Sequence, residues 1–321
     1  MRRVLAACIA SLLLYATAFA IILDRPLALG FLRAEIEAKL ARAAAVGSPK
    51  LVILSGSNGP YSHRCQVMEP QLNRPCVNGG VAVGIGLDYL FARWKPLLHP
   101  GDIVYLPMEE AQYVRSREAT AVGPDAAIML RHDRATLAAL PEDRWAGALF
   151  ASGPRGAVMS LIEMALDAGG FHDPRAAVTG ETNAWGDHVG HTAQLASFNT
   201  AVLAAAVPYH PSAAAIRDGY GTQLIAAFIG WAQSHGVRVI GGLPTGFADS
   251  PMTEAELQAI RSVYLQTGGS FLELGNRSRY PREAFFDTPD HLNEMWQIRH
   301  SIAVARALAQ QNRPLASRAG F

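Results

Sequence analysis

The first apolar block of the chain runs from Val4 to Leu23 and contains no charged residue. Twenty helical residues at about 1.5 Å each span roughly 30 Å, which is the thickness of the hydrocarbon core of a bilayer. Arg2 and Arg3 precede this block, and such basic residues stay on the cytoplasmic side of a membrane. We therefore expect residues 1–24 to form a signal anchor, a single transmembrane helix that exports the rest of the chain.

Two alternatives for this segment stay open. Ala18-Phe19-Ala20 resembles the cleavage site of a secretory signal, although the apolar run continues through Leu23. The block could also be a helix buried in a protein core, but nothing polar interrupts it and it begins at the first residues of the chain.

Beyond residue 50, short apolar runs bounded by turn residues alternate with stretches of helical periodicity. Such runs are typical of parallel strands buried on both faces, and their alternation with helices is typical of an α/β domain. The sequence therefore predicts a three-layer α/β/α sandwich with a mostly parallel sheet, whose sites form at the carboxyl ends of the strands. The expected strands are 51–54, 76–78, 102–106, 237–240 and 270–273, and the expected helices are 84–94, 213–234 and 293–310.

Three parts follow from this pattern. After the anchor, residues 25–49 contain an amphipathic helix from Leu32 to Ala45 and a linker at Gly47-Ser48-Pro49. Residues 50–321 form the α/β domain. Within it, residues 123–210 are less regular and rich in Gly, His and Arg, so they are either long loops over the site or a helical insertion.

Composition narrows the class of protein further. The chain has 321 residues, of which 50% are hydrophobic and 17% charged, and this excludes a disordered or fibrous protein. Its 28 Lys and Arg against 27 Asp and Glu leave a net charge of +1, with no basic stripe, so no nucleic-acid partner is expected. A neutral or weakly charged glycan suits this balance better than a polyanion.

The cysteines fit an exported chain. Cys8 lies inside the apolar block, which leaves Cys65 and Cys76 as a pair on the exported side. An oxidising compartment favours a disulfide between them, and the alternative is two unpaired thiols. Their spacing is not that of metal ligands.

Two polar spots lie at opposite ends of the expected domain. Ser57 follows the first expected strand, in a turn that exposes a hydroxyl and leaves backbone N–H groups free to bind an anion. His291 precedes the last expected helix, with Asp287 and Asp290 just upstream. A serine hydroxyl becomes a useful nucleophile only beside a base of near-neutral pKa, which in turn needs a carboxylate to orient it.

Together these spots resemble the SGNH (GDSL-like) hydrolase superfamily. Within it, the chain resembles the membrane-anchored bacterial branch associated with exopolysaccharide and cell-wall acyl transfer, the AlgX/AlgJ/DltD-like proteins. The stretches that carry the likeness, in the order of the family, are Leu54–Asn58, Asn78–Gly80, Lys95-Pro96 with Gly101–Val104, and Asp287–Asn293.

The resemblance implies a role for each matching residue. Ser57 would be the nucleophile and His291 the general base, oriented by Asp287 with Asp290 as the alternative. The Asp-x-x-x-His spacing is one residue longer than the family's usual spacing. The oxyanion donors would be the backbone N–H groups of Ser57 and of Gly79 or Gly80.

The third block departs from the superfamily, which usually supplies an Asn side chain to the oxyanion hole. Here Pro107-Met108-Glu109-Glu110 follows the strand, and a carboxylate cannot donate a hydrogen bond unless it is protonated. Either Asn58 or Asn183 takes the place of that Asn, or the oxyanion hole is weaker. We therefore expect Glu109 to contact substrate, and we expect slow acyl transfer or a degenerate binding site.

A third cluster lies at Asn183–His191. We expect a loop over Ser57 in which Asn183, Trp185 and His191 contact a sugar or an acyl group, while a surface loop with no role is the alternative. Asp187, His188 and His191 together could ligate a metal, but no further ligand run accompanies them. No metal or other cofactor is expected.

These features predict a serine acyl esterase or O-acetyltransferase that acts on an exopolysaccharide or envelope glycan through an acyl-Ser57 intermediate. It would be anchored in the bacterial inner membrane with its catalytic domain in the periplasm, beside a membrane-bound acyltransferase or a polysaccharide synthase. The first alternative is a non-catalytic polysaccharide-binding or assembly subunit with the same fold. A metal-dependent hydrolase at the third cluster is a more distant one.

Overall fold

The computed structural model describes residues 2–22, 29–151, 165, 168–170 and 182–311. The end of the expected anchor and the stretches 152–164, 166–167 and 171–181 of the expected insertion lie outside these residues.

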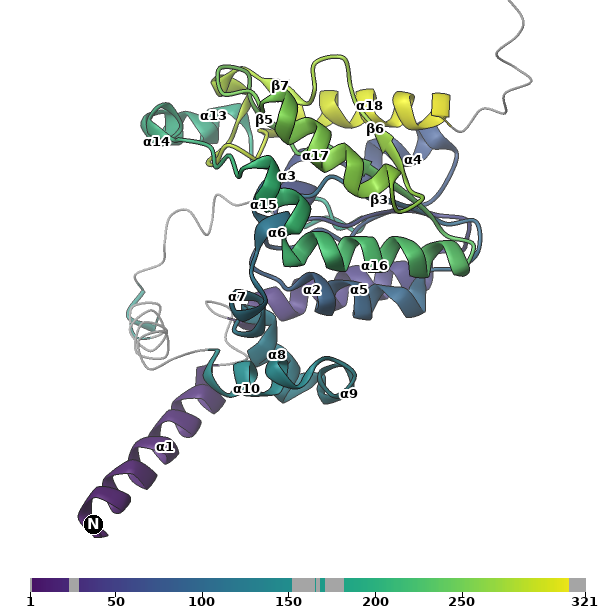
Figure 1. The fold of residues 1–321 in the computed structure, drawn as a ribbon. Coiled ribbons are helices and arrows are strands. Elements are labelled where there is room, and N and C mark those ends of the chain that lie inside the picture. The colour runs from purple at the N-terminus through teal and green to yellow at the C-terminus, as the bar shows by residue number, and fades with distance from the viewer. Residues whose placement is uncertain (1, 23–28, 152–164, 166–167, 171–181, 312–321) are drawn as a thin grey trace, which may run out of the picture.

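Five parallel strands form the central sheet (Figure 1). Their spatial order is β2-β1-β3-β4-β6. All five correspond to strands expected from the sequence, so the predicted α/β class with a mostly parallel sheet is confirmed. The strands are β1 (Leu51–Ile53), β2 (Cys76–Asn78), β3 (Ile103–Leu106), β4 (Arg238–Gly242) and β6 (Ser270–Leu272), and a separate two-stranded sheet pairs β5 (Gly246–Phe247) with β7 (Arg279–Tyr280).

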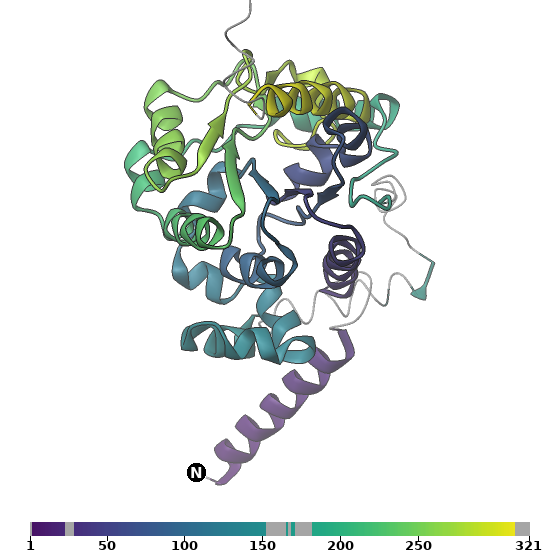
Figure 2. The same cartoon turned by 90° about the vertical axis from the view of Figure 1, so that its right-hand side faces the viewer.

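Helices cover both faces of the sheet, as Figure 2 shows along the strands. Successive side chains of a strand point to opposite faces, so Leu51 and Ile53 join one hydrophobic core while Val52 joins the other. The core of Leu51 is completed by α4 (Cys65–Leu72) and α18 (Glu294–Gln311). The larger core of Val52 is completed chiefly by α2 (Leu29–Ala45), α5 (Leu87–Trp94), α16 (Tyr220–Ser234) and α17 (Glu254–Leu265).

Helix α2 is part of the packed domain. Ile36, Leu40 and Ala43 are buried in the larger core, and Lys39 is 1% exposed. The segment 25–49, which the sequence pattern separates from the domain, therefore contains a helix that packs on the sheet.

The remaining helices are short. The expected helix 213–234 is interrupted at Gly219, where a side chain would collide with the carbonyl oxygen of Tyr113. The other helices are α3 (Asn58–Ser62), α6 (Glu110–Val114), α7 (Arg117–Ala121), α8 (Pro124–His132), α9 (Arg134–Ala138), α10 (Glu142–Phe150), α13 (Ala193–Ala196), α14 (Thr200–Ala205) and α15 (Ala213–Asp218), with 3-10 turns at Lys95–Leu97, Ser197–Asn199 and Arg282–Ala284.

The described part of the expected insertion contains both helices and a loop, since residues 182–192 form no helix. Helices α8, α9 and α10 lie together at one end of the molecule (Figure 1). Arg144 of α10 is 2% exposed, and its guanidinium pairs with the buried carboxylates of Asp88 on α5 and Asp125 on α8. This ionic cluster fastens the insertion to the domain.

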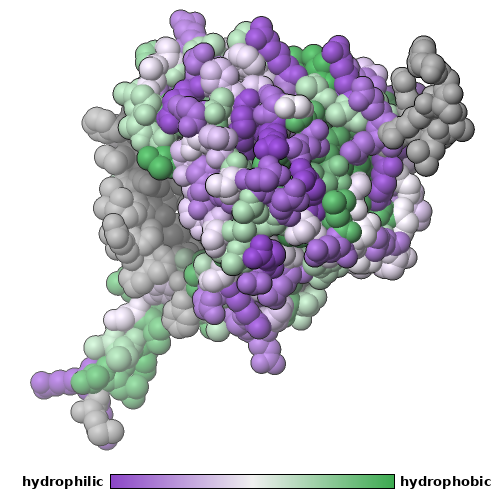
Figure 3. All heavy atoms as spheres, turned by 45° about the horizontal axis from the view of Figure 1, so that its top comes forward, coloured by the Kyte–Doolittle hydropathy of each residue, from purple (hydrophilic) through white to green (hydrophobic). Residues whose placement is uncertain are grey.

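The N-terminal apolar block forms α1 (Arg2–Ile22), which projects from the α/β part (Figure 1). Its apolar side chains are exposed, with Leu14 at 72% and Val4 at 67%, so α1 is not a core helix. They form the green region at the lower left of Figure 3. No helix of the described residues is both long enough and apolar enough to cross a membrane, so the expected transmembrane helix is not confirmed.

Candidate active site

Ser57 lies in the turn that joins β1 to α3. The turn follows the buried end of β1, and Ser57 is the residue before the first turn of α3, with its side chain half-buried. Its hydroxyl Oγ is 3.5 Å from Oε1 of Glu109, which is the limit of a hydrogen bond. The hydroxyl is therefore placed at the carboxyl end of the sheet, as expected for a site in a parallel α/β domain.

His291 is paired with Asp287. The Nδ1 atom of His291 is 2.7 Å from Oδ1 of Asp287, and Asp290 makes no hydrogen bond to the ring. Burial opposes protonation of the imidazole, but the hydrogen bond to Asp287 and the negative charges around the ring outweigh it and raise the pKa of His291. Of the two aspartates, Asp287 is thus the one that is hydrogen-bonded to His291.

Helix α3 brings the two polar spots together. Tyr61 lies one helical turn after Ser57, and its ring stacks on the His291 ring with centroids 4.1 Å apart. Ser62 donates a hydrogen bond to the carbonyl oxygen of Asp290 and accepts one from the N–H of Leu292. The segment that carries His291 is therefore fixed to α3, the helix that follows Ser57.

Among the described residues, no hydrogen bond joins Ser57 to His291. The Ser57 hydroxyl faces the carboxyl of Glu109, whose negative charge also acts on the pKa of His291.

The expected oxyanion donors are mostly engaged within the protein. The N–H of Gly79 donates to the carbonyl of Ile53, and the N–H of Gly80 donates to the side chain of Asn78. Gly80 packs against the carbonyl of Gly56, close to the turn, whereas Gly79 packs on Trp94. The prediction that Gly79 supplies an oxyanion donor is therefore wrong, because its N–H is used in the sheet. Within the described residues, the N–H of Ser57 forms no hydrogen bond.

Asn58 does not replace the missing amide donor either. Its side chain is fully buried, and Nδ2 donates to the carbonyl of Pro107 at 2.7 Å. The expected substitution by Asn58 is therefore wrong, because this amide faces the protein interior.

Glu109 occupies the place expected for that amide. A capping box at the start of α6 fixes it, since its N–H donates to Oε1 of Gln112, which also accepts from the N–H of Gly56. Its carboxyl oxygen Oε1 accepts a hydrogen bond from the N–H of Asn58 at 3.1 Å. Burial and the negative charge of Asp290 raise the pKa of Glu109 to about 7.

A cavity of about 220 Å³ opens beside this carboxyl. Burial and Asp290 also raise the pKa of Glu110 to about 8, and burial raises the pKa of Asp290. Arg279 faces the cavity with a distance of 3.8 Å between Nη2 and Oε1 of Glu110. The polar and aromatic lining residues are Glu109, Glu110, Tyr209, Arg279 and Asp290.

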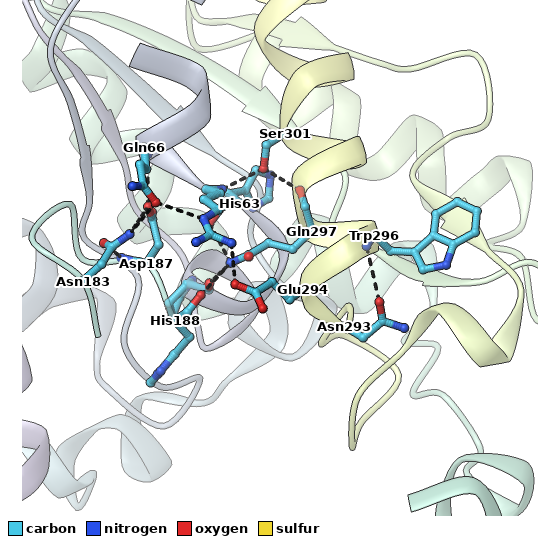
Figure 4. A network of polar contacts seen from close by, with 12 residues as sticks. His63, Gln66, Asn183, Asp187, His188, Asn293, Glu294, Trp296, Gln297 and Ser301 are labelled. Carbon is cyan, nitrogen blue, oxygen red and sulfur yellow. Dashed lines mark hydrogen bonds and ion pairs between the residues drawn. The ribbon is translucent and has the colours of Figure 1, made fainter. Parts of the chain in front are cut away.

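The loop Asn183–His188 holds the edge of the sheet and does not line the cavity. The carboxylate of Asp187 accepts hydrogen bonds from the N–H groups of Cys65 and Gln66 and from the side chain of Asn183 (Figure 4). The indole N–H of Trp185 donates to Glu69. The expected contact of Asn183 and Trp185 with substrate is therefore not supported, because their polar groups bind the protein itself.

The cysteine pair lies next to this loop. Cys65 at the start of α4 is bonded to Cys76 of β2 in a disulfide. The bond ties α4 to β2.

His191 and His188 surround Tyr61. His188 stacks on the Tyr61 ring at 4.3 Å, and His191 meets it edge-on at 5.2 Å. Burial lowers the pKa of His188 to about 3 and that of His191 to about 4, so both rings are neutral. His191 is fully buried and supports the ring that His291 stacks on, so it cannot contact substrate as expected.

No group of three or more metal-ligating side chains is found in the described parts of the chain. The carboxylate of Asp187 is already surrounded by donors, and His188 and His191 lie against Tyr61. The alternative metal site at these residues is therefore not formed.

Several residues that support the site were not among those predicted from the sequence. Lys39 of α2 donates to the carbonyl of Gly80 and pairs with Glu35, and both are buried. Lys39 is one of three lysines in a chain that otherwise uses arginine, and this rarity could have marked it as a residue with a specific contact. The position of Tyr61, one helical turn after Ser57, could likewise have indicated a place in the site.

A comparison of the chain with protein-family models and with curated proteins finds no match.

Proposed function

We propose that the protein is an exported serine acyl esterase or O-acyltransferase of the SGNH type that acts on an exopolysaccharide or envelope glycan. The observation that carries the proposal is the convergence, through Tyr61 and Ser62 of α3, of the Ser57 turn with the segment in which Asp287 is hydrogen-bonded to His291. This convergence is built by α3, and a polar turn without a role would not need it.

The proposed reaction begins when the Ser57 hydroxyl turns toward His291. Oγ attacks the acyl carbonyl, its proton passes to the imidazole, and the electron pair of the carbonyl π bond moves to the oxygen. Asp287 holds the tautomer with the proton on Nδ1 and stabilises the imidazolium that forms. Collapse of the tetrahedral intermediate expels the alcohol, which takes the proton from His291 and leaves acyl-Ser57. Water or a sugar hydroxyl then attacks the ester by the same steps.

The cavity is lined by Glu109 and Asp290, neighbours of Ser57 and His291, and not by Ser57 or His291 themselves, and it suits part of one sugar ring beside the acyl group. Its volume of about 220 Å³ is below the roughly 300–1,000 Å³ of most ligand pockets. The exposed ring of Tyr209 offers a face for a sugar, and the carboxyl groups and Arg279 offer hydrogen-bond partners for its hydroxyls. An acetyl ester or acetyl acceptor on a glycan is therefore the substrate class that we propose.

Export to the periplasm is part of the proposal. The disulfide between Cys65 and Cys76 is of a kind that persists in oxidising compartments. The exposed apolar side chains of α1 suit contact with the inner membrane, and a membrane-bound acyltransferase or a polysaccharide synthase is the partner that we propose there.

Labelling with a fluorophosphonate probe tests the proposal directly. The wild-type protein should be labelled and should hydrolyse p-nitrophenyl acetate, and Ser57→Ala should abolish both. Ser234→Ala, at an exposed serine of α16, is the matched control and should behave as wild type. Equal behaviour of wild type and Ser57→Ala would remove the enzymatic proposal.

A non-catalytic glycan-binding subunit is the second candidate. It is favoured by the absence, among the described residues, of a hydrogen bond between Ser57 and His291, and by the engaged N–H groups of Gly79 and Gly80. Retention of an acetylated glycan by a protein that the probe does not label would favour this candidate.

A further inference from the structure

The carboxyl of Glu109 occupies the anion-binding position of the Ser57 turn. One oxygen atom, Oε1, accepts from the N–H of Asn58 at 3.1 Å and lies 3.5 Å from the hydroxyl of Ser57. A Cβ atom at Gly56 would lie only 2.3 Å from this oxygen, so the glycine makes room for it. Glu109 is therefore built into the turn that would hold the substrate carbonyl.

Besides the N–H of Ser57, which forms no hydrogen bond within the described residues, the turn has few donors to offer a developing oxyanion. The N–H groups of Gly79 and Gly80 are engaged with Ile53 and Asn78, and the N–H of Asn58 is engaged with Glu109 itself. An ionised Glu109 would repel a negative charge on the substrate oxygen. A neutral Glu109 would instead be a donor in the same position.

Burial is the main cause that favours the neutral form of Glu109, and the charge of Asp290 adds to it, whereas His291 and the hydrogen bonds from Asn58 and Ser57 oppose it. Asp290 and His291 face it from the segment before α18, Glu110 follows it in α6, and Arg279 of β7 pairs with Glu110. The carboxyl groups of Glu109, Glu110 and Asp290 thus lie near one arginine and one histidine. Burial and the charge of Asp290 together raise the pKa of Glu109 to about 7 and leave a large neutral fraction near neutral pH.

We propose that Glu109 is a catalytic residue that acts in its protonated form, donating a hydrogen bond from its carboxyl to the acyl oxygen of the substrate. This rests on the proposed function at the same site. As Oγ of Ser57 bonds to the acyl carbon, the π electron pair moves to the oxygen that faces the Glu109 O–H. The proton of Glu109 stays on Glu109 throughout, and only His291 accepts and returns a proton.

The pH dependence follows from the two required protonation states. His291 must be neutral to accept the Ser57 proton, so activity rises as the pH passes its pKa. Glu109 must be neutral to donate, so activity falls as the pH rises through its pKa. The wild-type profile of kcat/KM is therefore a bell, with an alkaline limb that falls about tenfold per pH unit.

The test is the pH profile of p-nitrophenyl acetate hydrolysis between about pH 5 and 9 for three variants. Glu109→Gln keeps a donor that cannot ionise, so its profile should rise and then stay flat on the alkaline side. Glu109→Ala removes the donor and should lower kcat/KM about 10²- to 10³-fold at neutral pH. Glu142→Gln, at an exposed carboxylate of α10, should match wild type.

An alkaline limb in Glu109→Gln like that of wild type would overturn the proposal, and so would equal activity of the Ala and Gln variants. If Glu109→Ala does not fold, the profile of Glu109→Gln decides alone, because the amide has the same shape as the acid. Failure of the proposed function itself would be seen separately, as a wild-type protein that the fluorophosphonate probe does not label.

Discussion

Replacing the carboxylate that holds His291 is the sharpest test of the catalytic pair. In Asp287→Asn the side chain keeps its shape but loses the charge that fixes the Nδ1 proton of His291. The 2.7 Å bond between Nδ1 and Oδ1 joins a charged acceptor to a buried ring, and such bonds contribute about 1.5–3 kcal/mol. Because Asp287 is about one-third exposed, we take the lower half of that range.

A loss of about 1.5–2.2 kcal/mol corresponds to a decrease in kcat of roughly 10- to 40-fold. The amide also favours the wrong tautomer of the imidazole, which extends the expected decrease toward 10⁴-fold. The acidic limb of the pH profile should move to lower pH, because Asp287 is the principal cause of the raised pKa of His291. The assay is p-nitrophenyl acetate turnover across pH, with thermal unfolding measured in parallel.

Asp290→Asn is the matched control for this experiment. Asp290 is adjacent to His291 but makes no hydrogen bond to the ring, so its loss should lower kcat far less than the loss of Asp287. Because Asp290 also raises the pKa of Glu109, the two variants are compared on the acidic side of the profile, where Glu109 is neutral; if Asp290→Asn impaired turnover there as much as Asp287→Asn, the assignment of Asp287 would be refuted. An acidic limb that did not move in Asp287→Asn would refute the electrostatic reasoning.

Three further predictions concern stability and the support of the site. Arg144→Ala leaves two aspartates buried without their cation and should cost about 3–5 kcal/mol, roughly 10 °C in Tm, whereas loss of the exposed pair in Arg117→Ala should leave Tm nearly unchanged. Replacing Cys65 and Cys76 by Ser opens a loop with a separation of 11 residues and should lower the free energy of unfolding by about 3 kcal/mol, measured in urea. Lys39→Met leaves the buried carboxylate of Glu35 without its cation and removes the hydrogen bond to the carbonyl of Gly80. It should therefore lower Tm and slow labelling by the probe. Unchanged labelling would contradict this role of Lys39.

The sheet was predictable because its strands carry a local signal. Leu51–Ile53 and Ile103–Leu106 are short apolar runs bounded by turn residues, and a strand buried on both faces needs that composition wherever it lies in the chain. The break at Gly219 was not predictable, since it depends on the close approach of Tyr113, more than one hundred residues away.

Only part of the candidate site could be predicted from the sequence. Ser57, His291 and Asp287 can be selected from residue type, order and position after a strand or before a helix. The sequence does not show that the N–H of Gly79, the side-chain amide of Asn58 and the loop at Asn183 bind other parts of the protein, because these hydrogen bonds form only when the chain folds.

By itself, the sequence determined the class of fold and the pair of cysteines available for a disulfide. These properties are encoded in apolar periodicity, chain order and residue type, which are local. Only the tertiary structure decided that Asp287 and not Asp290 holds His291, that Lys39 supports the glycine loop, and that Glu109 sits against Ser57 with a raised pKa. Those outcomes depend on burial and on distances between segments far apart in the chain, and neither quantity exists until the chain has folded.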